Sequence, residues 1–491
     1  MSSAKGLVGA TQVTRSRKLT FGVSQAAKSR RLVRVAALLI PILTSALFMR
    51  AQSTDAVITG TVTDAQGGVL PGVTVTAVNA DNGLTRTAVT GDDGQYRVAP
   101  LPPGTYSLTA EQTGFASLQL KGLVLTIGLE LSENITLKVG SVAQSVTVTT
   151  ETPAVQTTNS EVASDVVDRL QVDSLPITQR QAAMLALLEP GTTSDAGRVS
   201  RPLASVGAGA VNPAGTNYLL DGLSNVISGN GDPRDLVQEA TVQEFKVIVA
   251  QAPAEYGFRA AGVVTVASKG GTNQFHGEAF EYFRDHYINR LDILSQQIHN
   301  SNPAANPIQP FSRNQFGGEI GGPIKKDKLW GLFSFEELDD HEYFTVAPGG
   351  FKSPTVTAVY APLEGSFRGG ALFREYFGRL DYQFNSRNTA FLRFSEQYPA
   401  LNYAQSAGGN AAAYSSGDSS TRSWAWAFVD TWLISDKTVN QFAAQVAQSW
   451  QDTVTPQFST PSLFPNGSIQ VVFPNMTWGF YPGTQFPPFY Q

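Results

Sequence analysis

The chain has 491 residues, of which 42% are hydrophobic, 10% aromatic and only 15% charged, and it contains 45 glycines. This composition is typical of β-rich proteins with many turns, and the length allows two to four domains. The absence of cysteine excludes disulfide bonds, thiolate metal sites and cysteine nucleophiles.

Residues 1–52 are predicted to be a signal peptide or leader. They hold nine Lys or Arg residues and no acidic residue, and a basic cluster precedes the apolar run Val35–Phe48. These fourteen residues are too few to span a bilayer but suit the apolar region of a signal peptide, with cleavage near Ala51 or Gln52. A retained N-terminal anchor is the alternative, and the unusual length of the leader also allows an over-extended start at Met1.

Removing the leader makes the remaining chain acidic. It then holds 26 basic and 40 acidic residues, a net charge of −14. Because nucleic acid repels a chain this acidic, we predict no nucleic-acid partner.

Residues 53–140 are predicted to fold as a small β-sandwich. Seven short segments are separated by Gly, Asp and Pro turns: Ile58–Thr63, Val73–Val78, Leu84–Thr90, Gln95–Val98, Thr105–Ala110, Leu118–Thr126 and Leu129–Lys138. The stretches ITGTVTDAQGGVLPGVTVTAV and TGDDGQYRVAPLPPGTYSLTAEQTGF resemble the carboxypeptidase regulatory-like (carbohydrate-binding-like) fold.

No residue pattern in the chain indicates hydrolysis. A zinc peptidase of the carboxypeptidase type needs a His-x-x-Glu pair, and none of the four histidines has one: His276, His286, His299 and His341. Neither a G-x-S-x-G motif nor a Walker-type loop occurs. We therefore predict that the chain is not an enzyme and that it needs no cofactor, nucleotide or metal.

Residues 141–160 are predicted to be a linker rich in Thr and Val. The simplest interpretation is a last sandwich strand followed by connecting chain. One segment also resembles a TonB box, the extended peptide that an inner-membrane energiser grips in an outer-membrane receptor: Ser145, Val146, Thr147, Val148, Thr149 and Thr150. Such a grip works by strand addition, in which backbone hydrogen bonds supply the affinity.

Residues 161–272 are predicted to form an α+β domain. Helices are expected at Val166–Asp173 and Gln179–Leu188, and strands at Phe245–Val249 and Gly262–Ala267. Three motifs at family spacing resemble the plug domain of TonB-dependent outer-membrane receptors of the Oar-like branch: Leu220, Asp221 and Gly222; Gln243, Glu244 and Phe245; Glu255, Tyr256 and Gly257. The segment Gly270–Asn273 is interpreted as a hinge-like exit from the plug into the barrel wall.

Residues 273–491 are predicted to be the N-terminal part of a transmembrane β-barrel. Seven candidate strands, several of them alternating cleanly between apolar and polar side chains, are Gln274–Arg284, Asn314–Gly322, Leu329–Glu337, Phe373–Phe384, Thr389–Tyr398, Thr421–Leu433 and Val439–Trp450. The connections between them alternate between long and short, as the extracellular loops and periplasmic turns of outer-membrane barrels do. Aromatic residues near the strand ends suit interfacial girdles: Trp330, Tyr376, Tyr398, Trp432 and Trp450.

Seven strands are too few for a closed barrel around such a plug. Single-chain bacterial barrels usually have even strand numbers, and an open edge in lipid leaves backbone groups unpaired. No terminal strand is predicted after Trp450. The resemblance implies a barrel of about 22 strands, so we expect the chain to be a C-terminally truncated fragment.

The predicted fold class is mainly β: a small β-sandwich, an α+β plug and the first strands of an incomplete antiparallel transmembrane barrel. The resemblance implies a TonB-dependent outer-membrane receptor or transporter, with the sandwich and plug on the periplasmic and lumen side. The substrate would be a nutrient such as an oligosaccharide, a peptide or a siderophore-like molecule, with cobalamin also open. Its partners would be a TonB-type inner-membrane energy-coupling complex, outer-membrane lipid and an unknown extracellular ligand.

Two other functions fit the sequence. The first is a surface-displayed carbohydrate-binding or adhesion protein that uses the barrel as an anchor. It depends on Tyr96, Tyr106 and Phe115, which could stack on sugars if they are exposed. The second is a soluble secreted β protein, in which the strand-end aromatic residues would form an ordinary core.

Overall fold

The structure of the protein is a computed structural model. It describes residues 54–140, 145–149, 164–167, 169–174, 180, 186, 192–194, 204–206, 216–227, 233–235, 237–249, 252, 256, 262–288, 300, 311–346, 365–402, 418–435, 438–454, 471–473 and 476–478. The predicted leader lies outside these residues. Among the residues that are described, no helix has both the length and the apolar composition needed to cross a membrane.

Residues 54–140, together with one later strand, form two packed sheets. In the first sheet β1 (Ala56–Asp64) pairs with three strands: β4 (Gln95–Leu101), β7 (Glu130–Ser132) and β8 (Ile135–Leu137). The second sheet has the order β3–β2–β5–β6–β9, with β2 (Thr74–Asn79), β3 (Thr85–Val89), β5 (Gly104–Glu111), β6 (Ser117–Leu125) and β9 (Ser145–Thr149). Inward-facing apolar side chains such as Ile58, Val75 and Leu108 fill the core between the sheets, as in other β-sandwiches.

The predicted strand Leu129–Lys138 is in fact two strands, β7 and β8, which both run parallel to β1. Between them the Asn134 side chain accepts a hydrogen bond from the Thr61 backbone N–H at 2.9 Å. The Glu133 carbonyl lies so close to Gly60 that a Cβ at this glycine would come within 1.8 Å of it. The break between β7 and β8 depends on contacts with β1, which is distant in the sequence. The local alternation of apolar and polar residues could therefore not predict it.

The domain predicted to be a plug, which we call the plug after that prediction, is organised around a five-stranded sheet with the order β10–β15–β16–β13–β14. The strands are β10 (Ser164–Val167), β13 (Thr216–Leu220), β14 (Leu223–Ser224), β15 (Val242–Ile248) and β16 (Gly262–Ser268). A short helix α2 (Arg169–Ser174), a hairpin of β11 (Thr192–Ser194) with β12 (Ala204–Val206), and the 3-10 turn η4 (Glu239–Thr241) complete its described elements. Phe245, Val247 and Val264 are among the residues of its buried core.

The helix predicted at Val166–Asp173 is wrong in its first part. Val166 and Val167 belong to β10, which pairs antiparallel with β15, and the helix begins at Arg169. β-Branched valines suit a strand, and the pairing with β15 decides between the two structures. The helix predicted at Gln179–Leu188 lies almost entirely outside the described residues.

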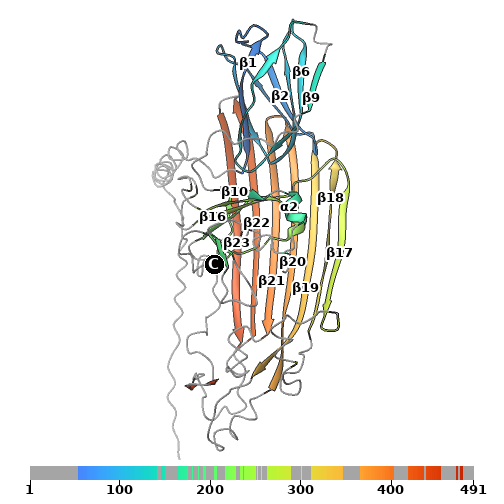
Figure 1. Cartoon of the computed structure of the whole chain (residues 1–491), viewed down its shortest axis with the longest axis vertical. Coiled ribbons are helices and arrows are strands. Elements are labelled where there is room, and N and C mark those ends of the chain that lie inside the picture. The colour runs from blue at the N-terminus through green and yellow to red at the C-terminus, as the bar shows by residue number, and fades with distance from the viewer. Residues whose placement is uncertain are drawn as a thin grey trace, which may run out of the picture. The chain divides into compact units, whose positions relative to one another are not determined.

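The wall is one sheet of seven strands in which each strand pairs with the next along the chain (Figure 1). They are β17 (His276–Asp285), β18 (Ser312–Lys325), β19 (Leu329–Val346), β20 (Gly365–Asn385), β21 (Asn388–Asn402), β22 (Asp418–Ser435) and β23 (Thr438–Val454). All seven predicted strands are confirmed, and all six pairings are antiparallel. A small hairpin of β24 (Val471–Phe473) with β25 (Met476–Trp478) follows.

The connections between wall strands alternate in length as predicted. The long ones cover residues 286–311, 347–364 and 403–417, and the short ones cover 326–328, 386–387 and 436–437. We call the end of the wall that carries the short connections the short-turn end. In outer-membrane barrels the short connections are the periplasmic ones.

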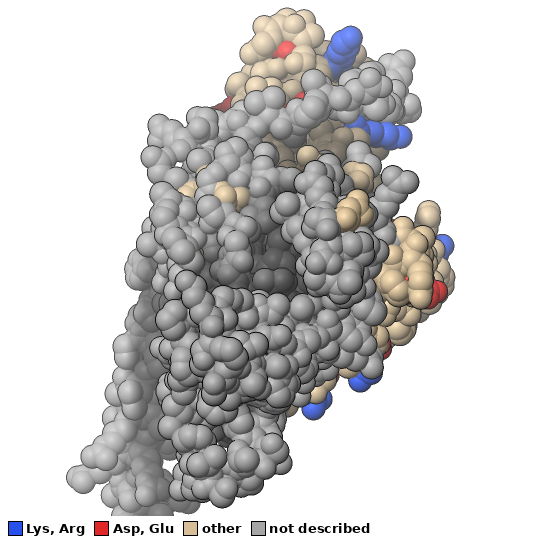
Figure 2. All heavy atoms as spheres, turned by 60° about the horizontal axis from the view of Figure 1, so that its bottom comes forward, with Lys and Arg blue, Asp and Glu red and all other residues tan. Residues whose placement is uncertain are grey.

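The wall buries many polar side chains and exposes many large apolar ones, which reverses the usual pattern of a soluble β-sheet. Its buried positions include polar and charged side chains: Gln315, Glu319, Ser334, Glu336, Asp340, Arg393, Ser395, Gln397, Ser423 and Ser449. Its exposed positions include large apolar ones: Ile320, Phe333, Leu380, Leu392, Trp426, Phe428, Phe442 and Val446. Figure 2 colours the Lys, Arg, Asp and Glu residues of the described part of the chain, which are seen toward the top and the right of this view. An apolar outer face and a polar inner face are what a wall in lipid requires.

Candidate functional site

The Leu220-Asp221-Gly222 motif forms the tight turn between β13 and β14. Asp221 and Gly222 both have positive φ, 51° and 76°, which is the geometry of a two-residue hairpin turn with an Asp-Gly sequence. The Asp221 backbone N–H donates to the Val266 carbonyl at 2.8 Å, which ties the turn to β16. The turn presents the Asp221 carboxylate to the wall.

Asp221 joins plug strand β16 to two arginines of the wall. Its carboxylate accepts hydrogen bonds from the Ser268 N–H and hydroxyl, both at 2.8 Å. It also contacts Arg393 on β21 at 2.5 Å and Arg379 on β20 at 3.5 Å. Burial raises the pKa of Asp221, but Arg393, Arg379 and the Ser268 hydrogen bonds together outweigh this effect, and the resulting pKa lies below the ordinary value of an aspartate. The plug is therefore held to the wall by a carboxylate that stays ionised.

Arg379 extends this cluster toward the plug exit. Its guanidinium donates to the Ser268 hydroxyl at 2.8 Å and forms an ion pair with Asp381 at 2.8 Å. It also stacks on the Phe391 ring, with 4.1 Å between the guanidinium carbon and the ring centroid. The guanidinium is thus fixed from three sides.

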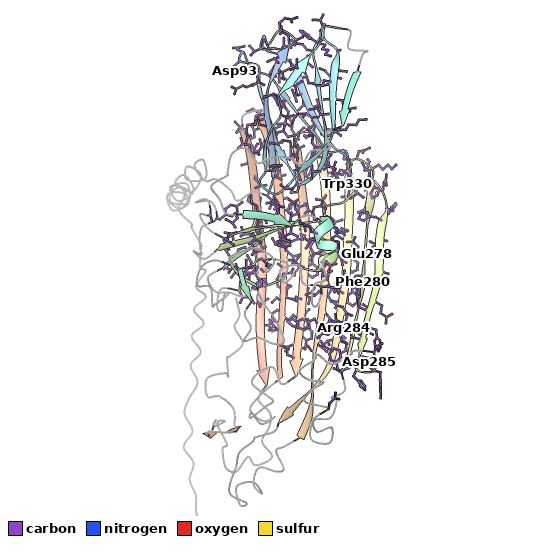
Figure 3. The ribbon with its side chains drawn as sticks, viewed as in Figure 1. Asp93, Glu278, Phe280, Arg284, Asp285 and Trp330 are labelled. Carbon is purple, nitrogen blue, oxygen red and sulfur yellow. The ribbon has the colours of Figure 1, made fainter. Side chains whose placement is uncertain are left out.

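A second cluster surrounds Arg180 of the plug. Its guanidinium lies 3.3 Å from Glu239 of the plug and 3.6 Å from Glu336 of β19. It stacks on the Phe280 ring at 4.1 Å and donates to the Tyr282 hydroxyl at 3.0 Å. Phe280 is labelled in Figure 3, on the same strand as Glu278 and Arg284.

A third ion pair lies just after β16. The Lys269 ammonium lies 2.6 Å from the Glu319 carboxylate of β18. Burial lowers the pKa of Lys269, and hydrogen bonding and charge from Glu319 partly offset this effect. The three clusters place plug charges against β18, β19, β20 and β21 of the wall.

The segment Gly270–Asn273, interpreted above as a hinge, is anchored to the wall. The Gly271 N–H donates to Asp381 at 3.1 Å, and the Asn273 side chain accepts from the Trp330 indole N–H at 2.9 Å. A Cβ at Gly271 would lie 2.0 Å from the Trp330 Cβ, so only glycine fits this approach. Trp330, near the start of β19, is labelled in Figure 3. The hinge interpretation overlooked these side-chain contacts, which fix the segment in place.

The other two plug motifs lie in or beside the sheet. Gln243, Glu244 and Phe245 are in β15, where Phe245 belongs to the core and the Glu244 carboxylate accepts from the Ile127 N–H of the sandwich. Tyr256 is buried in a small cluster with Leu219, Ile248 and Val263. Glu255 and Gly257 lie outside the described residues.

The segment that resembles a TonB box lies at the edge of the second sandwich sheet. Residues Ser145–Thr149 form β9, which pairs parallel with β6, and Thr150 lies outside the described residues. One backbone edge of β9 is bonded to β6, and β9 ends the order of named strands on that side. The segment is thus a last sandwich strand, which is also an extended peptide at a sheet edge.

The aromatic residues that supported carbohydrate binding belong to the sandwich core or pack against it. Tyr96 and Tyr106 are buried in the sandwich core, and Phe115 packs against it. The Tyr96 hydroxyl donates to the Glu133 carbonyl at 2.7 Å, and the Tyr106 hydroxyl to the Pro102 carbonyl at 2.8 Å. The carbohydrate-binding hypothesis therefore loses its residue support.

Sequence reasoning did not predict these charged residues of the plug–wall contacts: Arg180, Glu239 and Lys269 on the plug, and Glu319, Glu336 and Arg393 on the wall. The sequence signal that could have found the wall residues is an ionisable side chain at a strand position predicted to face the lumen, because ionisable groups inside a membrane protein are most often functional. Within the parts of the chain that are described, no group of three or more His, Asp or Glu residues is placed to hold a metal ion.

Two domain families match the chain. Residues 57–138 match the carboxypeptidase regulatory-like domain, and residues 267–366 and 354–489 match the outer membrane beta barrel domain. The chain carries an outer-membrane β-barrel domain. The resemblance to the carboxypeptidase regulatory-like fold and the prediction of outer-membrane barrel strands are thereby confirmed, and the match places the protein in the outer membrane, which excludes a soluble secreted protein.

A curated relative supports the same assignment. The chain is 26% identical over 290 residues to the TonB-dependent transporter Oar of Myxococcus xanthus, covering 57% of this chain. The matched part is about a quarter (26%) of the length of Oar.

Two solved structures that align with part of the chain are a transporter and a receptor of the outer membrane. The transporter YddB from Escherichia coli aligns at 12% identity with a TM-score of 0.41, covering 59% of this chain and 39% of its own. The ferric enterobactin receptor PfeA from Pseudomonas aeruginosa aligns at 14% identity with a TM-score of 0.41, covering 59% and 41% respectively.

Proposed function

We propose that the chain acts as the sandwich, plug and wall strands of a TonB-dependent outer-membrane transporter, and not as an enzyme. The observation that carries this proposal is the ionic contact of Asp221 with Arg379 and Arg393. A folded domain held by charged groups against the polar inner face of a lipid-exposed wall suits a plug that closes a passage and is later moved. The likeness to Oar supports the same function.

The plug–wall interface is polar, which suits repeated separation. Its described contacts include many ion pairs and hydrogen bonds, such as Lys269–Glu319 at 2.6 Å and the Gln445 amide to the Ser224 carbonyl at 2.8 Å. Water can replace such contacts when the two surfaces part. The energy for the movement would come from the inner membrane, so the proposal requires no nucleotide site in this chain.

The segment Ser145–Thr150 is the proposed contact for a TonB-type energy-coupling complex. Because β9 is bonded to β6 along one edge, its other edge can accept an added strand through backbone hydrogen bonds. The proposed cargo is a nutrient of the oligosaccharide, peptide or siderophore-like class, recognised by extracellular loops and the plug apex.

Site-specific photocrosslinking tests the proposal. A photoreactive amino acid at Val146 in β9 should form an adduct with a TonB-type protein in energised cells. The same amino acid at Val139, which is 78% exposed on the sandwich and lies outside β9, serves as the matched control and should form none. If the protein reaches the outer membrane but forms no adduct at Val146, the proposal is overturned and a surface anchor is favoured.

A further inference from the structure

The sandwich has a face that is buried outside its own core. Ile127 is fully buried and Arg86 is 2% exposed, yet neither belongs to the core cluster between the two sheets. A fully buried arginine is rare unless other groups satisfy its guanidinium. Both side chains must therefore be covered by another part of the chain.

The plug and the wall supply that cover. The Ile127 N–H donates to the Glu244 carboxylate of β15. The Arg86 guanidinium donates to the Ser386 carbonyl at 2.8 Å and to the Thr389 hydroxyl at 3.2 Å. Ser386 lies in a short connection of the wall, so this face of the sandwich meets the short-turn end.

A third contact reaches the exit segment of the plug. The Asn273 N–H donates to the Asp81 carbonyl of the sandwich at 2.8 Å. The same asparagine holds the Trp330 indole N–H at 2.9 Å through its side chain. The sandwich thus contacts the plug sheet, the exit segment and the wall at three separate places.

The guanidinium of Arg86 is only partly satisfied in this contact. Burial lowers the pKa of Arg86, and the nearby Asp55 carboxylate offsets only part of this effect. Its Nε–H has no hydrogen-bond partner among the described residues. A buried cation that is partly satisfied stabilises an interface less than an apolar side chain of the same size would.

A cavity lies behind the contact. Its lining comes from the sandwich (Asn79 and Pro103), the plug (Asp221 and Gln243) and the wall (Thr389 and Gln441). The sandwich therefore closes one side of a space into which the Asp221 cluster opens.

The strand β9 connects this contact to the proposed energiser site. It pairs with β6 from Ser117↔Ser145 to Lys121↔Thr149. β6 ends at Leu125, and Ile127, whose N–H binds Glu244, follows two residues later. A pull on β9 along this pairing reaches β15 of the plug through the sandwich.

We propose that the sandwich face formed by Asp81, Arg86 and Ile127 is a reversible docking surface for the plug and the short-turn end of the wall of the same chain. In the docked state the sandwich covers the plug. A pull on β9 separates this face from the plug and is transmitted to Glu244 of β15 through the Ile127 N–H. The part played by the pull rests on the proposed function, whereas the docking itself does not.

Hydrogen exchange on the purified full chain in detergent micelles tests the docking. Arg86→Glu reverses the charge beside Asp55 and should accelerate exchange of the Ile127 and Asn273 amides at least about tenfold, because both donate across the interface. Arg97→Glu makes the same change at an exposed position of the sandwich and should leave both amides unchanged. The Leu108 amide in the sandwich core should keep its rate in both variants.

A variant on the plug side separates undocking from unfolding of the sandwich. Glu244→Leu removes the acceptor for Ile127 and should accelerate both interface amides while Leu108 stays protected, whereas Glu244→Gln keeps an acceptor oxygen and should change them less. Unchanged Ile127 and Asn273 exchange in both Arg86→Glu and Glu244→Leu would overturn the docking. Accelerated exchange without an energiser adduct at Val146 would refute only the proposed function.

Discussion

Replacing Asp221 by Asn tests the ionic contact that holds the plug to the wall. The substitution keeps the side-chain volume and one acceptor oxygen but removes the charge that faces Arg393 at 2.5 Å and Arg379 at 3.5 Å. Arg379 keeps Asp381 at 2.8 Å. Arg393, whose side chain is 2% exposed, keeps no other ion-pair partner among the described residues.

The expected cost follows from that remaining buried charge. Removing one partner of a buried pair costs about 3–5 kcal/mol, because the other charge stays away from water. Because Asn keeps one acceptor oxygen, we expect the cost of Asp221→Asn to lie at the lower end of this range, about 3 kcal/mol. Since 1.4 kcal/mol is a factor of ten, local opening of the plug should become about a hundredfold more frequent.

Hydrogen exchange of the Ser268 amide measures this opening, because its N–H donates to the Asp221 carboxylate at 2.8 Å. The control Asp235→Asn removes a plug charge whose carboxylate accepts from the Val237 N–H at 3.0 Å within the plug, so it should leave Ser268 unchanged. Adding Arg393→Met to Asp221→Asn should restore much of the protection by removing the buried cation. A Ser268 amide that exchanges at the wild-type rate in Asp221→Asn would refute the reasoning.

The same cluster predicts how the plug contact depends on pH. The pKa of Asp221 is lower in the folded protein than in the unfolded chain, because Arg393, Arg379 and the Ser268 hydrogen bonds together outweigh its burial. Its contribution to stability is therefore complete above the unfolded value of about 3.9 and is lost as pH falls through the folded pKa. Protection of the Ser268 amide, corrected for intrinsic exchange, should stay constant from neutral pH down to about pH 4 and fall below it. In Asp221→Asn this fall should be absent.

Two further variants test the plug exit and the lipid-facing side of the wall. Gly271→Ala places a Cβ 2.0 Å from the Trp330 Cβ and should destabilise the exit by about 1–3 kcal/mol or more. Thermal unfolding checks this, with Gly378→Ala, where nothing lies within 4 Å, as the control; equal melting temperatures would contradict the packing argument. Leu380→Arg puts a charge at a 44% exposed apolar position of the outer face and should cost about 2–4 kcal/mol at mid-membrane depth. Folding yield into lipid vesicles measures it, with the lumen-facing Gln383→Arg as the control, and equal yields would show that Leu380 does not face lipid.

The strands and faces of the wall could be predicted from the sequence because they depend on local alternation. The side chains of β20 show this, since Tyr376 and Leu380 are exposed while Phe377 is buried and Arg379 is turned to the plug, as the alternation predicts. The Asp-Gly turn at Asp221 is equally local. The sequence therefore predicted the strands correctly over most of the wall.

The partners of the plug charges could not be predicted. Asp221 and Arg393 are 172 residues apart, and Glu244 and Ile127 are 117 apart. Such pairs form only after the register of several strands is set, and a shift of one residue would turn each side chain to the other face. The anchored exit segment was missed for the same reason, because Trp330 reaches Asn273 across 57 residues.

The reversed polarity of the wall has a consequence for the mechanics of the protein. An apolar interface between plug and wall would resist separation by roughly 25 cal/mol for each Å² exposed to water. Here the lining that a displaced plug leaves behind includes Glu319, Glu336 and Arg393, which water solvates well. Withdrawal of the plug therefore exposes ionisable side chains of the wall to water, which offsets part of the cost of separating the two surfaces.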